Sequence, residues 1–333
     1  MAGQRTLRDD VLSHMPSRIT IRQLEYFLSV CDFGSIAQAA QHCNVSSPSI
    51  SAAISQLETE LGLKLFVRRH AQGLTLSQAG EVFGERVRVI LRQVQGLNDL
   101  ANDLSGKVRG PLRVGCLLTF AQIILPKLRR SFIETYPEIE FHQFERDQAE
   151  IFDGLRTARF DVALSYDLDI PSDLDFMPLI DLPLFALFAE DHPLARAPAV
   201  TPEELNDHPM VLLDLPLSSE YFLSCFSRHG LRPNVVERTR DIAVMRSLVG
   251  NGFGYSLANI RPHSDRSPDG RRLCFVPLAA GPRALRLGLL TSQGAKAQRT
   301  VSAFLDHAKA LVPQELEPNV VRLPEARFCG AAE

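Results

Sequence analysis

The chain has 333 residues, of which 45% are hydrophobic and 23% charged, and its formal net charge is −3. A chain of this length and composition can fold into two or three ordinary globular domains. The net charge excludes a polycation that binds nucleic acid over its whole surface. The sequence shows no export signal and no apolar run long enough to span a membrane, so we expect a cytoplasmic protein without membrane contact.

Residues 19–62 hold three short segments with the apolar spacing of helices. The stripes of the first two consist of Leu24, Phe27, Leu28 and Cys31, then Ile36, Ala39, Ala40 and Cys43. Gly34 should end the first helix and Ser35 should cap the second. Asn44 should end the second helix, because Asn tolerates a left-handed backbone.

The third segment combines an apolar stripe with an outward face of small side chains. The stripe consists of Ile50, Ile54, Leu57 and Leu61, and the outward face of Ser49, Ser51, Ala52 and Ser55. Ser47 is expected to cap this helix, and Pro48 suits the first helical position, where no N–H is needed. A small or polar face can enter the major groove, so the segments predict a helix-turn-helix that binds double-stranded DNA. The alternative is a capped three-helix bundle whose serines meet only solvent.

Residues 24–80 resemble the DNA-binding domain of LysR-type transcriptional regulators. The similarity includes Gly34-Ser35-Ile36, Ala39-Ala40, Pro48-Ser49-Ile50-Ser51, Glu60-Leu61-Gly62 and Ala79-Gly80. It implies a winged helix-turn-helix over residues 19–76, preceded by a flexible extension at 1–18. The expected DNA-contact residues are Ser35, Ser46, Ser47, Pro48, Ser49, Ser51, Ala52, Ser55, Arg68, Arg69 and His70.

The chain departs from this family on the face that would read DNA. Family members often carry Gln and Arg there, whereas Ser47, Ala52 and Ser55 stand at those positions. Bidentate recognition of guanine by arginine is therefore unavailable from this helix, and phosphate contacts and DNA shape should supply much of the affinity. Arg68 and Arg69 in the expected wing are the best phosphate-contact candidates, although such a run can also be a solvated loop.

Residues 77–106 predict a long helix, with Ser77 as its cap. Its apolar residues alternate steps of four and three: Phe83, Val87, Ile90, Val94, Leu97, Ala101 and Leu104. This heptad seam favours pairing of two helices, and the resemblance likewise implies a dimer, with a tetramer expected on two neighbouring sites. A single helix packed on its own domain is the alternative.

Residues 110–312 predict an effector-binding domain. Strands and helices alternate there, which indicates βαβ units and a mostly parallel sheet. The resemblance implies a two-lobed, periplasmic-binding-protein-like α/β fold, with lobe I at 112–179 and 285–311 and lobe II at 180–284. Crossings are expected near Leu179–Leu182 and Gly281–Ala284, and residues 313–333 should form a tail.

A small-molecule effector would bind in the cleft between the lobes. Thr119, Ser218 and Ser219 should stand at helix starts, where hydroxyls and free N–H groups suit a carboxylate or another anion; plain N-capping is the alternative. Tyr166 could add an aromatic wall, and Phe253 lies in a Gly-rich turn that family members carry before a cleft strand. No arginine stands plainly at a cleft position.

No catalytic constellation, cofactor motif or metal-ligand spacing is seen, and the six cysteines are scattered. Some LysR-type relatives sense peroxide through a cysteine pair, so Cys225 and Cys274 are the residues to test for that role. An enzyme or a solute-binding protein with the same C-terminal fold are the alternatives. The sequence thus predicts an effector-responsive transcription factor, with RNA polymerase as a further candidate partner.

Overall fold

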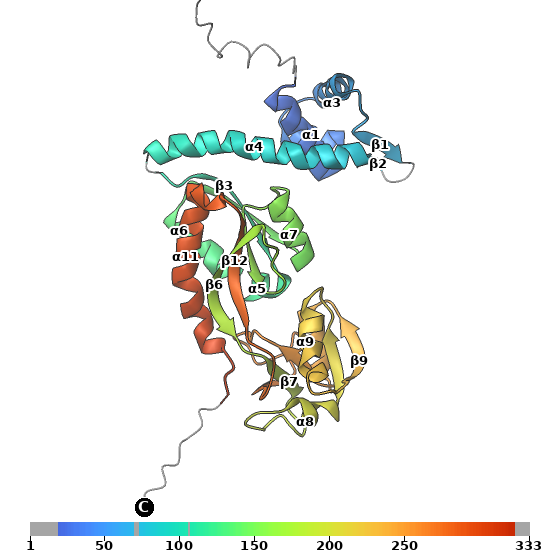
Figure 1. The fold of residues 1–333 in the computed structure, drawn as a ribbon, viewed down its shortest axis with the longest axis vertical. Helices are drawn as coiled ribbons and strands as arrows, with labels where there is room; N and C mark the ends of the chain where they lie inside the picture. The colour runs from blue at the N-terminus through green and yellow to red at the C-terminus, as the bar shows by residue number, and fades with distance from the viewer. Residues whose placement is uncertain (1–18, 70–72, 106, 324–333) are drawn as a thin grey trace, which may run out of the picture. The chain divides into compact units, whose positions relative to one another are not determined.

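The computed structural model describes residues 19–69, 73–105 and 107–323 (Figure 1). The chain divides into two compact units, Met1–Asn98 and Asp99–Glu333. Each unit has a hydrophobic core of its own. None of the helices in the described ranges is long and apolar enough to cross a membrane.

Three helices form the core of the N-terminal unit: α1 (Ile21–Phe33), α2 (Ile36–His42) and α3 (Ser47–Leu61). Their inward stripes meet at Phe27, Ile50 and Leu57, which are fully buried. Gly34 ends α1 with a left-handed φ of 61°, and the Ser35 hydroxyl caps α2. The predicted helix-turn-helix is confirmed.

The start of α3 differs from the prediction, and that of α1 was not predicted. Ser46, not Ser47, caps α3: its hydroxyl accepts a hydrogen bond from the Ser49 N–H at 3.3 Å. The first helix begins at Ile21, ahead of its apolar stripe, because Thr20 and Gln23 form a reciprocal capping box. Local hydrogen bonds, which periodicity does not encode, set both starts.

An antiparallel pair of short strands follows, β1 (Phe66–Arg69) and β2 (Gly73–Leu76). Arg68 and Arg69 belong to β1 itself rather than to the turn, and their backbones pair with Leu74 and Gly73. The pair has the place and pairing of the expected wing. His70 lies outside the described residues.

The start of helix α4 (Gln78–Ser105) is anchored to the backbone just before β1. The Ser77 N–H donates to the Leu65 carbonyl at 2.9 Å, and the Ser77 hydroxyl donates to the Lys64 carbonyl at 2.6 Å. The same hydroxyl accepts from the Gly80 N–H at 3.0 Å, as expected of a cap. A Cβ at Gly80 would overlap the Leu65 carbonyl oxygen, so only glycine allows this close approach.

The predicted heptad seam of α4 is partly used within the N-terminal unit. The Phe83 ring lies 5.2 Å from the Phe27 ring, and Val87 is buried in the same core. Phe83 and Val87 thus pack on their own domain, as expected for a single unpaired helix. Among the described side chains of α4, the large exposed apolar ones are Val82, Val89 and Ile90. The side chains of Leu97, Ala101 and Leu104 lie outside the described part.

The first lobe of the second unit, lobe I, is built on a five-stranded sheet of order β4-β3-β5-β12-β6. The strands are β3 (Gly110–Cys116), β4 (Ile139–Glu145), β5 (Val162–Tyr166), β6 (Leu174–Leu182) and β12 (Leu285–Ser292). β3 pairs in parallel with β4 and β5, whereas β12 is antiparallel to β5 and β6. The sheet is therefore mixed, not mostly parallel.

Four helices flank this sheet: α5 (Leu118–Ile123), α6 (Leu125–Thr135), α7 (Gln148–Arg156) and α11 (Arg299–Leu316). Figure 1 shows α6 and α11 on one side of the sheet and α7 on the other. Between β3 and β4 the helical segment is broken at Ile124 into α5 and α6, and a short 3₁₀ helix, Ala295–Ala297, precedes α11.

Lobe II combines a small antiparallel sheet with a parallel strand pair. The sheet has the order β10-β7-β11, with β7 (Phe185–Ala189) between β10 (Ser256–Ala258) and β11 (Leu273–Pro277). β8 (Pro209–Leu213) pairs in parallel with β9 (Asn234–Thr239). The helices are α8 (Pro202–Asn206), α9 (Ser218–Ser227) and α10 (Ile242–Gly250). The chain passes between the lobes from β6 to β7 and from β11 to β12.

The expected tail does not begin at residue 313. Helix α11 continues through Pro313 to Leu316, and a 3₁₀ turn follows at Glu317–Asn319. Val321 then packs in a small cluster with Phe185 and Ala258 of lobe II. Apolar contacts, which the proline obscures in the sequence, thus extend the folded unit beyond the predicted boundary.

Candidate DNA-binding surface and ligand pocket

The outward face of α3 is small and polar, as the sequence predicts. Its exposed residues are Ser46, Pro48, Ser49, Ser51, Ala52 and Ser55, and Ser47 is half-buried. The Ser46 and Ser49 hydroxyls lie 2.8 Å apart and bond to each other. Within the described part of the chain, the Ser51 and Ser55 hydroxyls have no hydrogen-bond partner. These two hydroxyls and the methyl group of Ala52 are therefore free to meet another molecule.

Glu58 fixes the wing relative to α3, a role that the sequence did not reveal. Its carboxylate accepts the N–H groups of Leu65 at 2.8 Å and Phe66 at 3.2 Å, and it pairs with Lys64 at 2.6 Å. Burial opposes ionisation of Glu58, but these hydrogen bonds outweigh it and lower the pKa of the carboxyl. The start of β1 is thus tied to the C-terminal end of the helix that would enter the groove.

A cavity of about 230 Å³ lies between lobes I and II. Its walls are mainly apolar, with side chains of Leu118, Leu213, Leu215, Phe222, Ile242 and Ile260 among them. Three of the predicted effector contacts, Thr119, Tyr166 and Ser218, line it and are buried. Such a concave, apolar site between two lobes suits a small organic ligand.

The other two predicted effector residues do not line this cavity. Ser219 follows Ser218 on α9 but is absent from the wall, and Phe253 is 52% exposed beside Val244 on the surface of lobe II. The Ser218 and Ser219 N–H groups are not free either, because they donate to the carbonyls of Pro216 and Leu215. The expected anion site at this helix start therefore lacks these two backbone N–H donors.

The sequence indicated no arginine at the cleft, but the wall of the cavity contains charged residues of both signs. Arg240 and Arg146 both line the cavity, as do the carboxylates of Glu145, Asp147 and Glu150. Asp147 and Glu150 form the capping box of α7, and Arg146 lies 3.8 Å from Glu150. Arg240 has no hydrogen bond or ion pair with the described residues. Acids outnumber bases on this wall, so it is not a general anion receptor.

Two amide side chains complete the polar part of the wall: Gln148 from lobe I and Asn259 from lobe II. Gln148 is 1% exposed and Asn259 is 3% exposed, yet the side-chain oxygen of each has no hydrogen-bond partner. Their NH₂ groups fix the amide orientation, because Gln148 donates to the Leu168 carbonyl at 2.7 Å and Asn259 to the Leu182 carbonyl at 3.0 Å. Asn259, a lone amide among the mostly apolar residues 255–260, was the one signal in the sequence for this pair.

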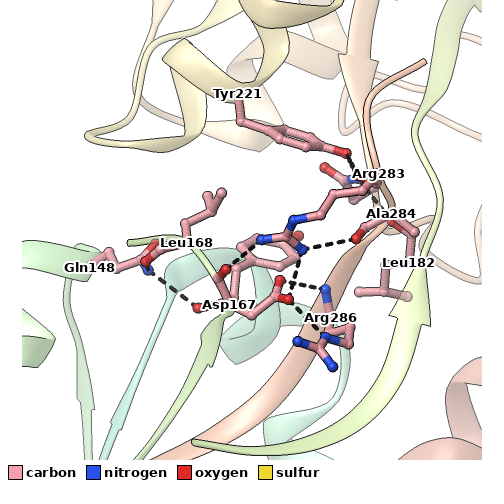
Figure 2. Close-up of polar contacts among 10 residues, drawn as sticks. Gln148, Asp167, Leu168, Leu182, Tyr221, Arg283, Ala284 and Arg286 are labelled. Atoms are coloured by element: carbon pink, nitrogen blue, oxygen red, sulfur yellow. Dashed lines mark hydrogen bonds and ion pairs between the residues drawn. The ribbon is translucent and has the colours of Figure 1, made fainter. Parts of the chain in front are cut away.

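An ion cluster lies beside the cavity at the crossing from β11 to β12 (Figure 2). The buried Asp167 carboxylate accepts from Arg283 at 2.7 Å, and from the guanidinium and N–H of Arg286 at 2.8 Å each. The Arg283 carbonyl accepts the Tyr221 hydroxyl at 2.8 Å, and Tyr221 also receives a long hydrogen bond from Asn259 at 3.4 Å. The cluster therefore joins lobe I, the crossing and lobe II.

Two family models match the chain in the order that this architecture suggests. The bacterial regulatory helix-turn-helix protein, lysR family, matches residues 21–81, and the LysR substrate binding domain matches residues 105–313. Within the described ranges, no group of His, Cys, Asp or Glu side chains is placed to hold a metal ion.

Three known proteins illustrate the similarity. HinK, a LysR family transcriptional regulator from Pseudomonas aeruginosa, is 32% identical with a TM-score of 0.59, covering 88% of this chain and 98% of that one. Full-length CbnR in complex with its target DNA is 22% identical, with a TM-score of 0.61 over 88% of this chain and 99% of that one. The hydrogen peroxide-inducible genes activator of Haemophilus influenzae is 24% identical over 302 residues, 88% of this chain and 99% of that protein.

The last of these relatives directs attention to Cys225 and Cys274. Both are free thiols, and burial raises the pKa of Cys225 to about 12. Burial also raises the pKa of Cys274, and the nearby carboxylate of Glu190 acts in the same direction. Because peroxide attacks the thiolate, neither environment favours rapid oxidation.

We therefore expect both thiols to stay reduced when the folded chain is treated with peroxide at concentrations that oxidise an activated thiol. Mass spectrometry after alkylation of the remaining thiols measures this directly. The unfolded chain, in which burial no longer raises the pKa, should be oxidised faster and serves as the control. Rapid formation of a Cys225–Cys274 disulfide in the folded chain would contradict the expectation.

Proposed function

This chain belongs to the LysR family of bacterial transcriptional regulators, and we propose that it binds a twofold-symmetric operator under the control of a small molecule. The observation that carries the proposal is the exposed, small-residue face of α3 inside a correctly capped helix-turn-helix. CbnR, which shares the fold, has been crystallised with its target DNA.

The contacts of α3 are assigned by exposure and position, and those of the wing by position alone. Ser51, Ala52 and Ser55 would enter the major groove, where hydroxyls reach bases or phosphates and a methyl group packs on thymine. Arg68 and Arg69 of the wing, with His70 beyond them, would contact phosphates. Ser35, Ser46, Ser47, Pro48 and Ser49 stand at the N-terminal ends of α2 and α3, where N–H groups suit phosphate oxygens.

Pairing of two chains through α4 would place two such surfaces on one operator. Val82, Val89 and Ile90 are exposed on this helix, and a solvated apolar stripe favours association. Further contacts between effector domains would give a tetramer on two neighbouring sites. A protein with this role works in the cytoplasm, beside the chromosome and RNA polymerase, and needs no catalytic centre.

The cavity between the lobes is the proposed effector site, with Thr119, Tyr166 and Ser218 as contacts. A ligand there touches both lobes, so its affinity depends on their arrangement. It can switch the protein only if it binds two arrangements with different affinity.

DNase footprinting on the DNA flanking the chain's own gene tests this function. We expect protection of a twofold-symmetric site, and uniformly weaker binding by Arg68→Ala/Arg69→Ala on every sequence. If both arginines contact phosphates, the slope of log K against log salt should fall by about two. Replacing Arg130, an exposed arginine of the effector domain paired with Glu134, by alanine is the control and should change neither quantity.

Absence of specific protection at low salt would refute the regulator assignment. Protection that the double variant leaves unchanged, with an unchanged salt slope, would refute the wing contacts alone.

A further inference from the structure

The chain joins lobe I to lobe II once more after the two crossings. Helix α11 runs along one side of the lobe I sheet (Figure 1), and its Phe304 ring lies 5.1 Å from the Phe132 ring of α6. The 3₁₀ turn Glu317–Asn319 follows, and the next residues reach lobe II. We call residues 317–323 the C-terminal strap. The match to the LysR substrate binding domain ends at residue 313, so the family model does not account for the strap.

An apolar contact and a polar contact attach the C-terminal strap to lobe II. Val321 is 9% exposed and packs with Phe185 of β7 and Ala258 of β10, which are buried as well. Two residues earlier, the side-chain nitrogen of Asn319 lies 3.1 Å from Nδ1 of His263, within hydrogen-bonding distance. Residues near a chain end are ordered when such contacts tie them down, so the strap is a specific attachment.

The strap contacts a strand that also lines the ligand cavity. Ala258 packs against Val321 and is part of the cavity wall. It belongs to β10, the three-residue edge strand of the small lobe II sheet. A ligand that shifts Ala258 would therefore change the contact between this strand and the strap.

The strap also holds lobe II at a strand that neither crossing contains. The two crossings lie together, since the Leu278 N–H donates to the Leu184 carbonyl at 3.2 Å. Two neighbouring connections form a hinge, about which one lobe can rotate with small changes of backbone angles. Val321 adds an attachment to β10, on the opposite side of β7 from β11. This third attachment opposes the rotation for as long as Val321 stays buried.

We propose that the C-terminal strap restrains the rotation of lobe II on lobe I, and thereby sets how readily the cleft changes its arrangement. The restraint is a property of the free chain, whereas its regulatory meaning rests on the proposed function of the cavity. A ligand that favours an arrangement without the Val321 contact would lose affinity by the cost of exposing that valine, and one that keeps the contact would not.

Hydrogen–deuterium exchange of the full chain, without DNA or ligand, tests the restraint. Val321→Asp would place a carboxylate in the apolar cluster, so the strap should leave lobe II. The readout is the crossing from β11 to β12, where the N–H groups of Leu278 and Arg286 are hydrogen-bonded. We expect their exchange to become about tenfold faster, because the burial of one valine no longer opposes opening. Strands β3 and β5 of lobe I should exchange as before.

Leu323→Asp is the matched control, since it makes a similar change in the same strap at a side chain that is 51% exposed. It should leave the exchange of both crossings unchanged. Val321→Ala removes only two methyl groups and should accelerate exchange in the same segments to a smaller extent. This milder variant keeps the test decisive if Val321→Asp fails to fold.

Faster exchange confined to β7 and β10, with Leu278 and Arg286 unchanged, would show that Val321 stabilises lobe II locally, and would overturn the proposal. An equal effect of Leu323→Asp, or no effect of either Val321 variant, would overturn it too. The measurement contains no DNA, so its outcome is separate from footprinting. A chain that protects no operator but shows the expected exchange keeps the restraint and loses the regulator function.

Discussion

Replacing Ala52 by glutamate is expected to lower the affinity for the operator by about 100-fold, because a carboxylate would face the phosphate-lined groove and like charges there cost several kcal/mol. Ala52 is exposed in the middle of α3, and neither the core nor the caps of the helix involve it. Glutamate is also a good helix former, so the change should leave the fold intact. Gel-shift titration at fixed salt measures the loss.

Ala52→Gln is the matched control, since glutamine has nearly the shape of glutamate without its charge. It should retain most of the affinity, because an amide can donate to bases and phosphates. Equal loss in both variants would mean that size, not charge, matters at this position. No loss in either would place the outward face of α3 away from DNA.

The second large effect is expected at Asp167, whose replacement by alanine should destabilise the effector-binding unit by about 2–3 kcal/mol. The carboxylate is 4% exposed and accepts three hydrogen bonds from Arg283 and Arg286, whose side chains are 57% and 49% exposed. Because water can reach both arginines once Asp167 is gone, the cost should lie below that of a fully buried pair.

Differential scanning calorimetry of the full chain measures this, and the melting temperature of the unit should fall by about 4–12 °C. The chain has no tryptophan, so calorimetry is preferable to intrinsic fluorescence. Asp173→Ala is the control: that carboxylate also forms a double hydrogen bond with an arginine, Arg156, but is 52% exposed. The melting temperature should fall much less for this variant, because solvent screens the exposed pair. Equal shifts for both variants would show that the crossing cluster adds no special stability.

The helices near the N-terminus were predictable because their signals are local. An apolar stripe with a stop at Gly34 and a cap at Ser35 lies within a few residues, and the same residues decide the structure. The strands of lobe I were harder to predict from the sequence. β6 contains Pro178 and lacks an alternating pattern of burial, and its place at the sheet edge depends on pairing with β12, more than a hundred residues away.

The residues that line the cavity show the same limit of prediction from local sequence patterns. Thr119 and Ser218 were found because each follows a strand and stands at a helix start, which is a local pattern. Gln148 reads as the ordinary first residue of a capped helix, and Arg240 as part of a polar loop. Only the fold brings these two residues and Asn259 to one wall, and no spacing in the sequence expresses that proximity.

The close approach of Gly80 to Leu65 sets the rotational position of α4 about its own axis. An α-helix turns by about 100° per residue, so this contact fixes the direction of the described side chains of α4. The exposed stripe of Val82 and Val89, one heptad apart, consequently has a fixed direction relative to the outward face of α3. In a dimer paired along that stripe, the contact at Gly80 would fix the angle between the paired face of α4 and the outward face of α3. That angle would help to determine how many base pairs separate the two half-sites.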